Sequence, residues 1–357
     1  MEFLERIWAT LEGGTPDMVP YAPYDNLVPR GSFERSLRNL GMGLCARRSG
    51  IWSESPNVRV ERRTEGNILR TIYHTPKGQV STAYTTRHDR LSDSGSVQIE
   101  WLIKEPADFE PVIFMIEDTV HHRDDAFEAN VVRDFGDDGI VRGAAVHPPY
   151  DSSENYFGLA NWIYFQRDYP EQFARLLDAL ERREARLFPL AAESKLKFVG
   201  FGSVSGSYSP ADYAKYTLPF YQKYVPLFAE RGKICAIHAH ASNLVVYEDM
   251  IKDTGCPVVE AFTPPPVGDL PIAEARRVLG PDTVIWVNFP ETVFYDGKDA
   301  VARYTRDLIE SDPQRNRLVI GFTEMGLFGI TDAYTEKAFK DGFLAIAETI
   351  NEYGRVG

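Results

Sequence analysis

Short apolar runs alternate with amphipathic segments through the second half of this chain. Helical periodicity over about residues 170–194 leads into the apolar run KFVGFGS, and ICAIHAH, PVVEAFT, TVIWVNFP and RLVIGFTE follow in turn. A helical pattern separates each run from the next, and a long helical segment reaches about residue 353. Continuous apolar strands that alternate with helices are typical of a parallel sheet buried on both faces.

The first half of the chain has a different pattern. Residues 58–86 alternate β-branched and polar side chains, with turn sequences at EGN and PKGQ, which predicts an antiparallel meander. Residues 130–146 read as strand, glycine turn and strand, MVPYAP near residue 18 reads as a short strand, and the acidic run 117–125 reads as a solvated helix end.

Five βα units in a row, with the earlier strand candidates, favour an α/β fold of the (β/α)8 barrel type. The alternative is a doubly wound open sheet. No strand leads into a GxGxxG or GxxxxGK[ST] loop, so the usual nucleotide-binding reason for that fold is missing. We predict one barrel domain over residues 1–357, with an antiparallel β elaboration over about residues 50–150.

Charge and cysteine content narrow the classes of function. The net charge is −13, from 52 acidic and 39 basic residues, which argues against a nucleic-acid partner. The 3 cysteines have no CxxC spacing, the first residues lack the apolar core of a signal peptide, and no apolar run approaches the roughly 20 residues of a membrane span. We expect a cytoplasmic protein with reduced thiols and no membrane contact.

Polar residues recur where the predicted strands end, and in a barrel these ends form the functional face. The residues in question are Ser203, Ser205, Tyr208, His238, His240, Glu260, Thr263, Asn288, Glu291, Thr323 and Glu324.

His238 and His240 are the most specific pair. One residue apart on a strand, they point the same way; the alternative is that one of them is a hydrogen-bonded structural residue. Glu324 ends the last predicted strand at the same face. Two imidazoles and one carboxylate make up many catalytic zinc sites that keep a fourth position open, and the same set also suits non-haem iron.

Other types of active site need residues that this sequence lacks. No histidine follows His240, which excludes amidohydrolase-type and cupin sites, and no GxSxG elbow is present for a serine hydrolase. Glu260 is a candidate fourth ligand, histidine-orienting partner, substrate contact or loop cap. Asn288 is a candidate substrate contact or turn former, and Tyr208 is a candidate pocket wall or core residue.

Several motifs together resemble the uroporphyrinogen decarboxylase superfamily, in particular its corrinoid- and cobalamin-dependent methyltransferases. They are MEFLERIWATLEGGTPDMVPYAP, YSPADYAKYTLPFYQKYV, the HxH strand end, VNFPETVFYDGKDAV and a last strand that runs into a long C-terminal helix. The resemblance spans most of the chain and implies a distorted TIM barrel. The arginine-rich segment of the decarboxylase proper has no match in PYAPYDNLVPRGSFER.

Methyltransferases of this superfamily bind zinc through His-x-Cys on one strand and a cysteine at the end of the last strand. The resemblance places His238, His240 and Glu324 at these positions, so an imidazole and a carboxylate stand where the family has thiolates. Such a harder site suits the polarisation of an oxygen, as in removing a methyl group from a methoxy donor.

The resemblance thus implies a zinc-dependent demethylation of a small donor, for example a methoxylated aromatic compound. Iron is the alternative metal for the same two imidazoles and carboxylate. The methyl group would pass to a separate corrinoid protein, since no cobalamin-binding module is present in the sequence. Two alternatives remain: a metal-dependent decarboxylase or hydrolase with Glu260 as general base, and a non-catalytic small-molecule binding protein.

Overall fold

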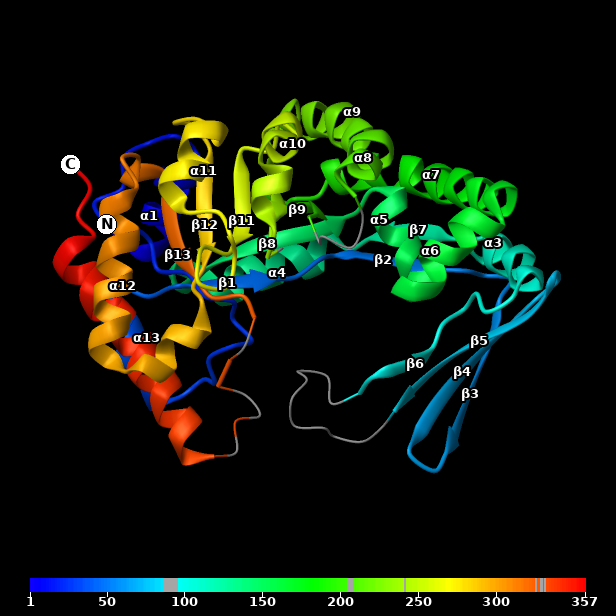
Figure 1. Ribbon diagram of the computed structural model, residues 1–357, viewed down its shortest axis with the longest axis horizontal. Coiled ribbons are helices and arrows are strands. Elements are labelled where there is room, and N and C mark those ends of the chain that lie inside the picture. The colour runs from blue at the N-terminus through cyan, green and yellow to red at the C-terminus, as the bar shows by residue number, and fades with distance from the viewer. Residues whose placement is uncertain (86–95, 205–208, 241, 325, 328–329, 331) are drawn as a thin grey trace. The chain divides into compact units, whose positions relative to one another are not determined.

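The computed structural model describes residues 1–85, 96–204, 209–240, 242–324, 326–327, 330 and 332–357 (Figure 1). The chain forms two compact units. The first, which we call the parallel-sheet unit, comprises Met1–Gly50, Asp124–Ala145 and Ser194–Gly357; the second, the antiparallel-sheet unit, comprises Ile51–Arg123 and Val146–Glu193. The predicted single domain over residues 1–357 stays a prediction.

The parallel-sheet unit contains seven strands that neighbour one another in chain order. They are β1 (Leu44–Arg47), β8 (Gly139–Val146), β9 (Phe198–Ser203), β10 (Ile234–His238), β11 (Val258–Phe262), β12 (Val284–Asn288) and β13 (Leu318–Gly321). The β1–β8 pair and each neighbouring pair from β9 to β13 are parallel. Every residue of β11 and β12 is buried, which confirms the strands predicted from the apolar runs.

One segment hydrogen-bonds to both edge strands of this sheet. The amide of Ala22 donates to the carbonyl of Ile320 in β13 at 2.8 Å, and the amide of Cys45 in β1 donates to the carbonyl of Pro23 at 2.9 Å. Pro20 and Pro23 lack an N–H, so the segment forms isolated parallel bridges rather than a strand. The fold is therefore a curled parallel α/β sheet. The expected eight-stranded barrel is confirmed in part, because seven strands form the sheet among the described residues.

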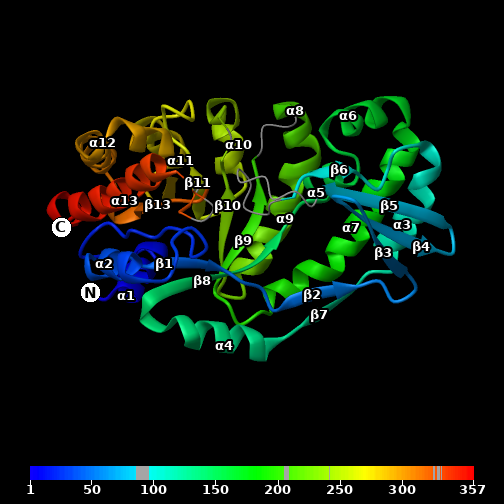
Figure 2. The same ribbon diagram turned by 90° about the horizontal axis from the view of Figure 1, so that it is seen from below.

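Helices accompany the strands of the parallel-sheet unit, coloured green to red from β9 onward in Figure 1. They are α1 (Phe3–Leu11), α2 (Ser32–Asn39), α4 (Asp125–Phe135), α8 (Pro210–Asp212), α9 (Leu218–Ala229), α10 (Glu248–Asp253), α11 (Ile272–Leu279), α12 (Lys298–Ser311) and α13 (Ala333–Tyr353). In α11 the buried residues Ile272, Ala275, Arg276 and Leu279 recur at helical spacing, so one face of the helix packs inward. α12 packs against α13 (Figure 1 and Figure 2).

The antiparallel-sheet unit confirms the predicted meander. Strands β3 (Arg59–Glu65), β4 (Ile68–Thr75) and β5 (Gly78–Thr85) pair antiparallel in this order, and β6 (Gln98–Glu100) pairs with β5 (Figure 2). A second antiparallel pair joins β2 (Ile51–Glu54) to β7 (Val120–Arg123). The helices of this unit are α3 (Phe109–Glu117), α5 (Pro149–Ser153), α6 (Leu159–Asp168) and α7 (Pro170–Ala192).

Two local predictions are wrong. The first half of residues 130–146 belongs to helix α4, because the Asp124 side chain caps its start by accepting from the Phe127 amide at 2.8 Å. Val131 and Phe135 of this helix pack on a buried cluster that contains Leu196. The acidic run 117–125, expected as a helix end, does begin with the last residue of α3, but its middle, Val120–Arg123, forms strand β7, which pairs with β2.

None of the helices in the described parts of the chain combines the length and apolarity that crossing a membrane requires.

Candidate functional site

Glu260 is the centre of a buried polar network in the parallel-sheet unit. This residue of β11 is fully buried, and its carboxylate accepts three hydrogen bonds. Tyr24 Oη donates to Oε1 at 2.5 Å, Arg142 Nη1 of β8 donates to Oε2, and His238 Nδ1 of β10 lies 3.0 Å from Oε2. Side chains from two strands and from the segment that joins the sheet edges therefore converge on one carboxylate.

The two strands that flank β10, β9 and β11, are each irregular opposite or next to His238. In β11 the register passes from Val259 opposite Ile285 to Phe262 opposite Val287, so Glu260 and Ala261 together face one residue of β12. Ala261 has φ 56°, a left-handed conformation that costs a non-glycine residue about 1–2 kcal/mol. In β9 the register with β10 also shifts, next to Gly202 with φ 60°. Such bulges redirect side chains and are common beside functional sites.

Glu260 is ionised at neutral pH. Burial alone would raise the pKa of its carboxyl, but the charge of Arg142 and the hydrogen bonds from His238 and Tyr24 outweigh burial and lower the pKa to about 2. Burial and the charge of Glu260 raise the pKa of Tyr24 well above its ordinary value, so the phenol keeps its proton and acts as a donor.

The ionised carboxylate fixes the tautomer of His238. A carboxylate can only accept, so Nδ1 of His238 carries the proton that points at Glu260. In the neutral form of the ring, the lone pair is therefore on Nε2. Metal-binding histidines are commonly held in this way by a carboxylate on the other ring nitrogen. The side chain of His238 is 23% exposed, so the ring is not sealed in the core.

His240 follows the end of β10, with its ring centroid 4.9 Å from that of His238. Desolvation by its surroundings and the imidazole of His238 lower the pKa of His240, whereas the carboxylate of Glu324 raises it. Glu324 also adds to the effect of burial in raising the pKa of Glu291. The charge of Glu324 therefore acts on both His240 and Glu291.

The prediction that Glu324 ends the last strand is wrong. β13 ends at Gly321, because the amide of Thr323 donates to the Asn288 side-chain carbonyl at 2.9 Å instead of continuing the strand ladder. Glu324 itself is exposed, and the Thr323 hydroxyl donates to its Oε1 at 3.4 Å.

As a donor set, His238, His240 and Glu324 suit zinc or iron, since both metals accept imidazole and carboxylate ligands. Over the described ranges, however, no group of three or more His, Cys, Asp and Glu side chains is close enough together to hold a metal ion. The fit of a metal ion to this site therefore rests on the two imidazoles and on the tautomer of His238. Zinc, iron and the ligand role of Glu324 stay predictions.

The cysteines do not supply a thiolate to this site. Cys45, Cys235 and Cys256 are buried and free. Burial raises the pKa of all three thiols, to about 12 for Cys256, so they stay protonated at neutral pH.

Asn288, expected as a substrate contact or turn former, links the ends of three strands through hydrogen bonds. Its Nδ2 donates to Thr263 Oγ1 at 3.2 Å, and its Oδ1 accepts from the Thr323 amide. A catalytic role for Asn288 stays a prediction. Tyr208 and Ser205 lie outside the described residues.

Sequence reasoning missed Tyr24 and Arg142. The signal for Arg142 was a single arginine inside the apolar strand GIVRGAAV, where a charge needs a buried partner. Tyr24 follows the short strand candidate near residue 18, but nothing local indicates that its hydroxyl contacts Glu260.

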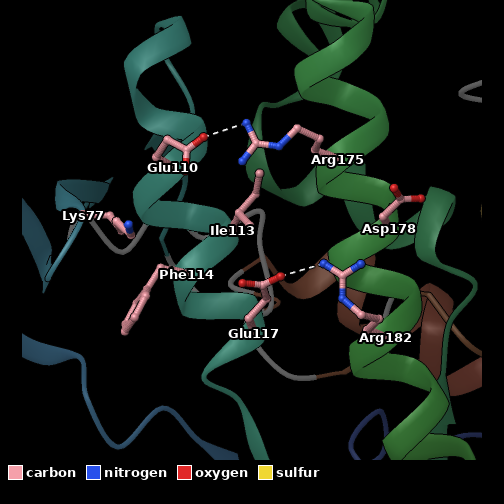
Figure 3. Close-up of a pocket in the computed structure, with 8 residues that line it drawn as sticks. All are labelled: Lys77, Glu110, Ile113, Phe114, Glu117, Arg175, Asp178 and Arg182. Atoms are coloured by element: carbon pink, nitrogen blue, oxygen red, sulfur yellow. Dashed lines mark hydrogen bonds and ion pairs between the residues drawn. The ribbon is translucent and has the colours of Figure 1, made fainter.

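A separate pocket in the antiparallel-sheet unit offers less chemistry. This pocket of about 370 Å³ lies between α3 and α7 (Figure 3). Its Arg175 pairs with Glu110 at 2.7 Å and its Arg182 with Glu117 at 2.6 Å, so these charges neutralise one another.

Comparison with known proteins supports the fold. No protein-family model and no curated protein sequence matches this chain. Among solved structures, a methyltransferase from Methanosarcina mazei aligns over 99% of this chain and 99% of that chain, with a TM-score of 0.58 and 10% identity. A B12-independent methionine synthase from Shewanella sp. W3-18-1 in complex with selenomethionine aligns over 94% and 98%, with a TM-score of 0.41 and 8% identity. At 10% identity, the first likeness shows a shared fold.

Proposed function

We propose that the protein is a metal-dependent methyltransferase of the uroporphyrinogen decarboxylase superfamily. It removes a methyl group from a small donor, such as a methoxylated aromatic compound, and passes it to a separate corrinoid protein. The hydrogen bond between Glu260 and His238 carries the proposal, because it presents Nε2 of His238 as a free ligand beside His240. The fold shared with a methyltransferase agrees with it.

Each residue of the site has a distinct part. His238, His240 and Glu324 would hold the metal, which would supply a Lewis acid for the oxygen of the methyl donor. Glu260 keeps the ring of His238 in one orientation and one tautomer, and Arg142 and Tyr24 hold Glu260 in turn. In the transfer, the methyl C–O bond breaks and its electron pair stays on the oxygen. A reduced corrinoid on the partner protein would supply the acceptor for the methyl group.

The low pKa of Glu260 argues against the decarboxylase or hydrolase alternative. That mechanism needs a general base near neutral pH, and a carboxylate with a pKa of about 2 is a weak base. Its lone pairs also already accept from Tyr24, Arg142 and His238. The non-catalytic alternative differs in needing no metal.

Metal analysis of the purified protein tests the site. We expect about one zinc or iron per chain in the wild type, and loss of most of it in His238→Ala and Glu324→Ala. His122→Ala, a histidine of β7, and Glu310→Ala, an exposed residue of α12, are the matched controls and should keep the metal. Stoichiometric metal in both site variants would contradict the proposed ligands.

A second assay separates the proposed reaction from its alternatives. The metal-loaded protein is incubated with methoxybenzenes and reduced cobalamin, and methylcobalamin is followed by its absorbance. Formation in the wild type and loss in His238→Ala is the expected result. Bound metal without methyl transfer to cobalamin or to a corrinoid protein would favour the decarboxylase or hydrolase.

A further inference from the structure

A basic pocket lies beside the Glu260 network in the parallel-sheet unit. It measures about 390 Å³, within the usual range for small-ligand sites, and is lined by Asn26, Arg47, Arg48, Ser49, Arg142 and Gly143. Three of these residues are arginines, in a protein whose net charge is −13. A concave surface with this charge attracts anions.

The pocket and the Glu260 network share residues. Arg47, the last residue of β1, is the register partner of Arg142 in β8. The guanidinium of Arg47 lies 4.0 Å from the centre of the Tyr24 ring, and Tyr24 donates to Glu260. A ligand in the pocket would therefore contact Arg142, which hydrogen-bonds the carboxylate that holds His238.

Two of the three arginines already have carboxylate partners. Arg48 pairs with Asp25, with Nη2 and Oδ2 2.6 Å apart, and Arg142 pairs with Glu260. In the described part of the chain Arg47 has no carboxylate within ion-pair distance; its guanidinium is exposed at the pocket and rests on the Tyr24 ring. The pocket thus keeps one positive charge that no side chain in the described ranges neutralises.

Arg142 lines the pocket and has a donor that no described side chain satisfies. Its side chain is 7% exposed, and its Nη1 makes the hydrogen bonds to Glu260 and Tyr24. Its Nε is buried and has no acceptor among the described residues. Buried donors of this kind are nearly always paired in native proteins, so an acceptor is missing here.

We propose that this pocket binds an oxyanion, a carboxylate or a phosphate, through Arg47 and Arg142. The assignment of this anion to the methyl donor rests on the function proposed above; the binding of the anion does not. The donor would then be a small molecule with an anionic group at one end and the methylated oxygen at the other. Guanidinium groups favour such groups because their planar forks match two oxygens at once.

Calorimetric titration at low ionic strength tests the pocket without any assay of activity. The probes are benzoate, inorganic phosphate and the neutral benzyl alcohol. Benzoate or phosphate should bind to the wild type, and Arg47→Gln should weaken that binding about tenfold or more, the loss expected for one charge-assisted hydrogen bond. Arg47→Lys should lose less, since it keeps the charge. The control Arg277→Gln, on the exposed face of α11, should bind as the wild type does.

The two anions distinguish the source of the ligand: tighter benzoate binding assigns a carboxylate, and tighter phosphate binding assigns a phosphate. Equal binding of benzyl alcohol, or unchanged anion binding in Arg47→Gln, would overturn the proposal. Because a carboxylate also ligates metals, benzoate is titrated into His238→Ala as well. Binding that persists there and fails in Arg47→Gln supports the pocket, whatever the metal analysis shows. Binding that fails in His238→Ala and persists in Arg47→Gln assigns the anion to the metal site and overturns the proposal.

Discussion

Glu260 in β11 and His238 in β10 are register partners across two parallel strands, and their side chains meet with 3.0 Å between Oε2 and Nδ1. Through this contact, the buried charge of Glu260 determines which ring nitrogen of the partly exposed His238 carries the proton. Because the carboxylate stays ionised, the proton of the imidazole stays on Nδ1, and the lone pair of Nε2 is directed away from Glu260.

Glu260→Gln should weaken metal binding without removing a ligand. A glutamine amide can donate to Nδ1 of His238, which favours the tautomer with the proton on Nε2 and blocks that nitrogen as a ligand. We expect a loss of about 10- to 100-fold in metal affinity, measured by competition with a chromophoric chelator. Glu274→Gln, an exposed residue of α11, is the control. Unchanged affinity in Glu260→Gln would mean that Glu260 does not orient a metal ligand.

The strands of the parallel sheet could be predicted because their signal is local. Each is a short apolar run bounded by helical periodicity, and burial of both faces demands that composition. The same pattern predicted three candidate site residues, because they are the polar residues at or near the ends of these strands: His238, Glu260 and Asn288.

The Glu260 network could not be predicted because its contacts are long-range. Tyr24 and Glu260 are 236 residues apart in sequence, and Arg142 and Glu260 are 118 apart. The bulge at Ala261, which sets the direction of Glu260, also has no sequence signature, because alanine is not a residue that favours a positive φ. At residues 130–135 the two valines suggested a strand, but the Asp124 cap and packing on the core favour a helix.

The low pKa of Glu260 predicts how stability changes in acid. The carboxyl has a pKa of about 2 in the folded protein against an ordinary value of 4.5, so between these values the unfolded chain binds more protons than the folded one. Stability from this group is therefore complete above about pH 4.5 and is lost as the pH falls toward 2.

Urea unfolding at a series of pH values measures this dependence. In Glu260→Gln the slope of unfolding free energy against pH in that window should fall by up to ~1.4 kcal/mol per pH unit, the contribution of one proton. The exposed control Glu274→Gln should keep the wild-type slope. The same slope in wild type and Glu260→Gln would show that Glu260 is not held ionised by its partners.

Gly200→Ala should loosen the network through packing alone. A Cβ on Gly200 in β9 would lie 3.2 Å from Cζ and from Nε of Arg142, tighter than ordinary contact. Arg142 is held by Glu260 and Tyr24, so it has little freedom to move away. We expect a loss of about 1–3 kcal/mol in the free energy of unfolding, the usual range for overpacking.

The Arg142→Ala background is the control. Arg142→Ala alone should cost about 3–5 kcal/mol, because it leaves Glu260 without its ion pair. Since the guanidinium is gone in this background, the methyl group added by Gly200→Ala should cost much less there. Urea denaturation of the four proteins gives the coupling between the two positions. Equal costs of Gly200→Ala in both backgrounds would show that Gly200 does not make room for Arg142.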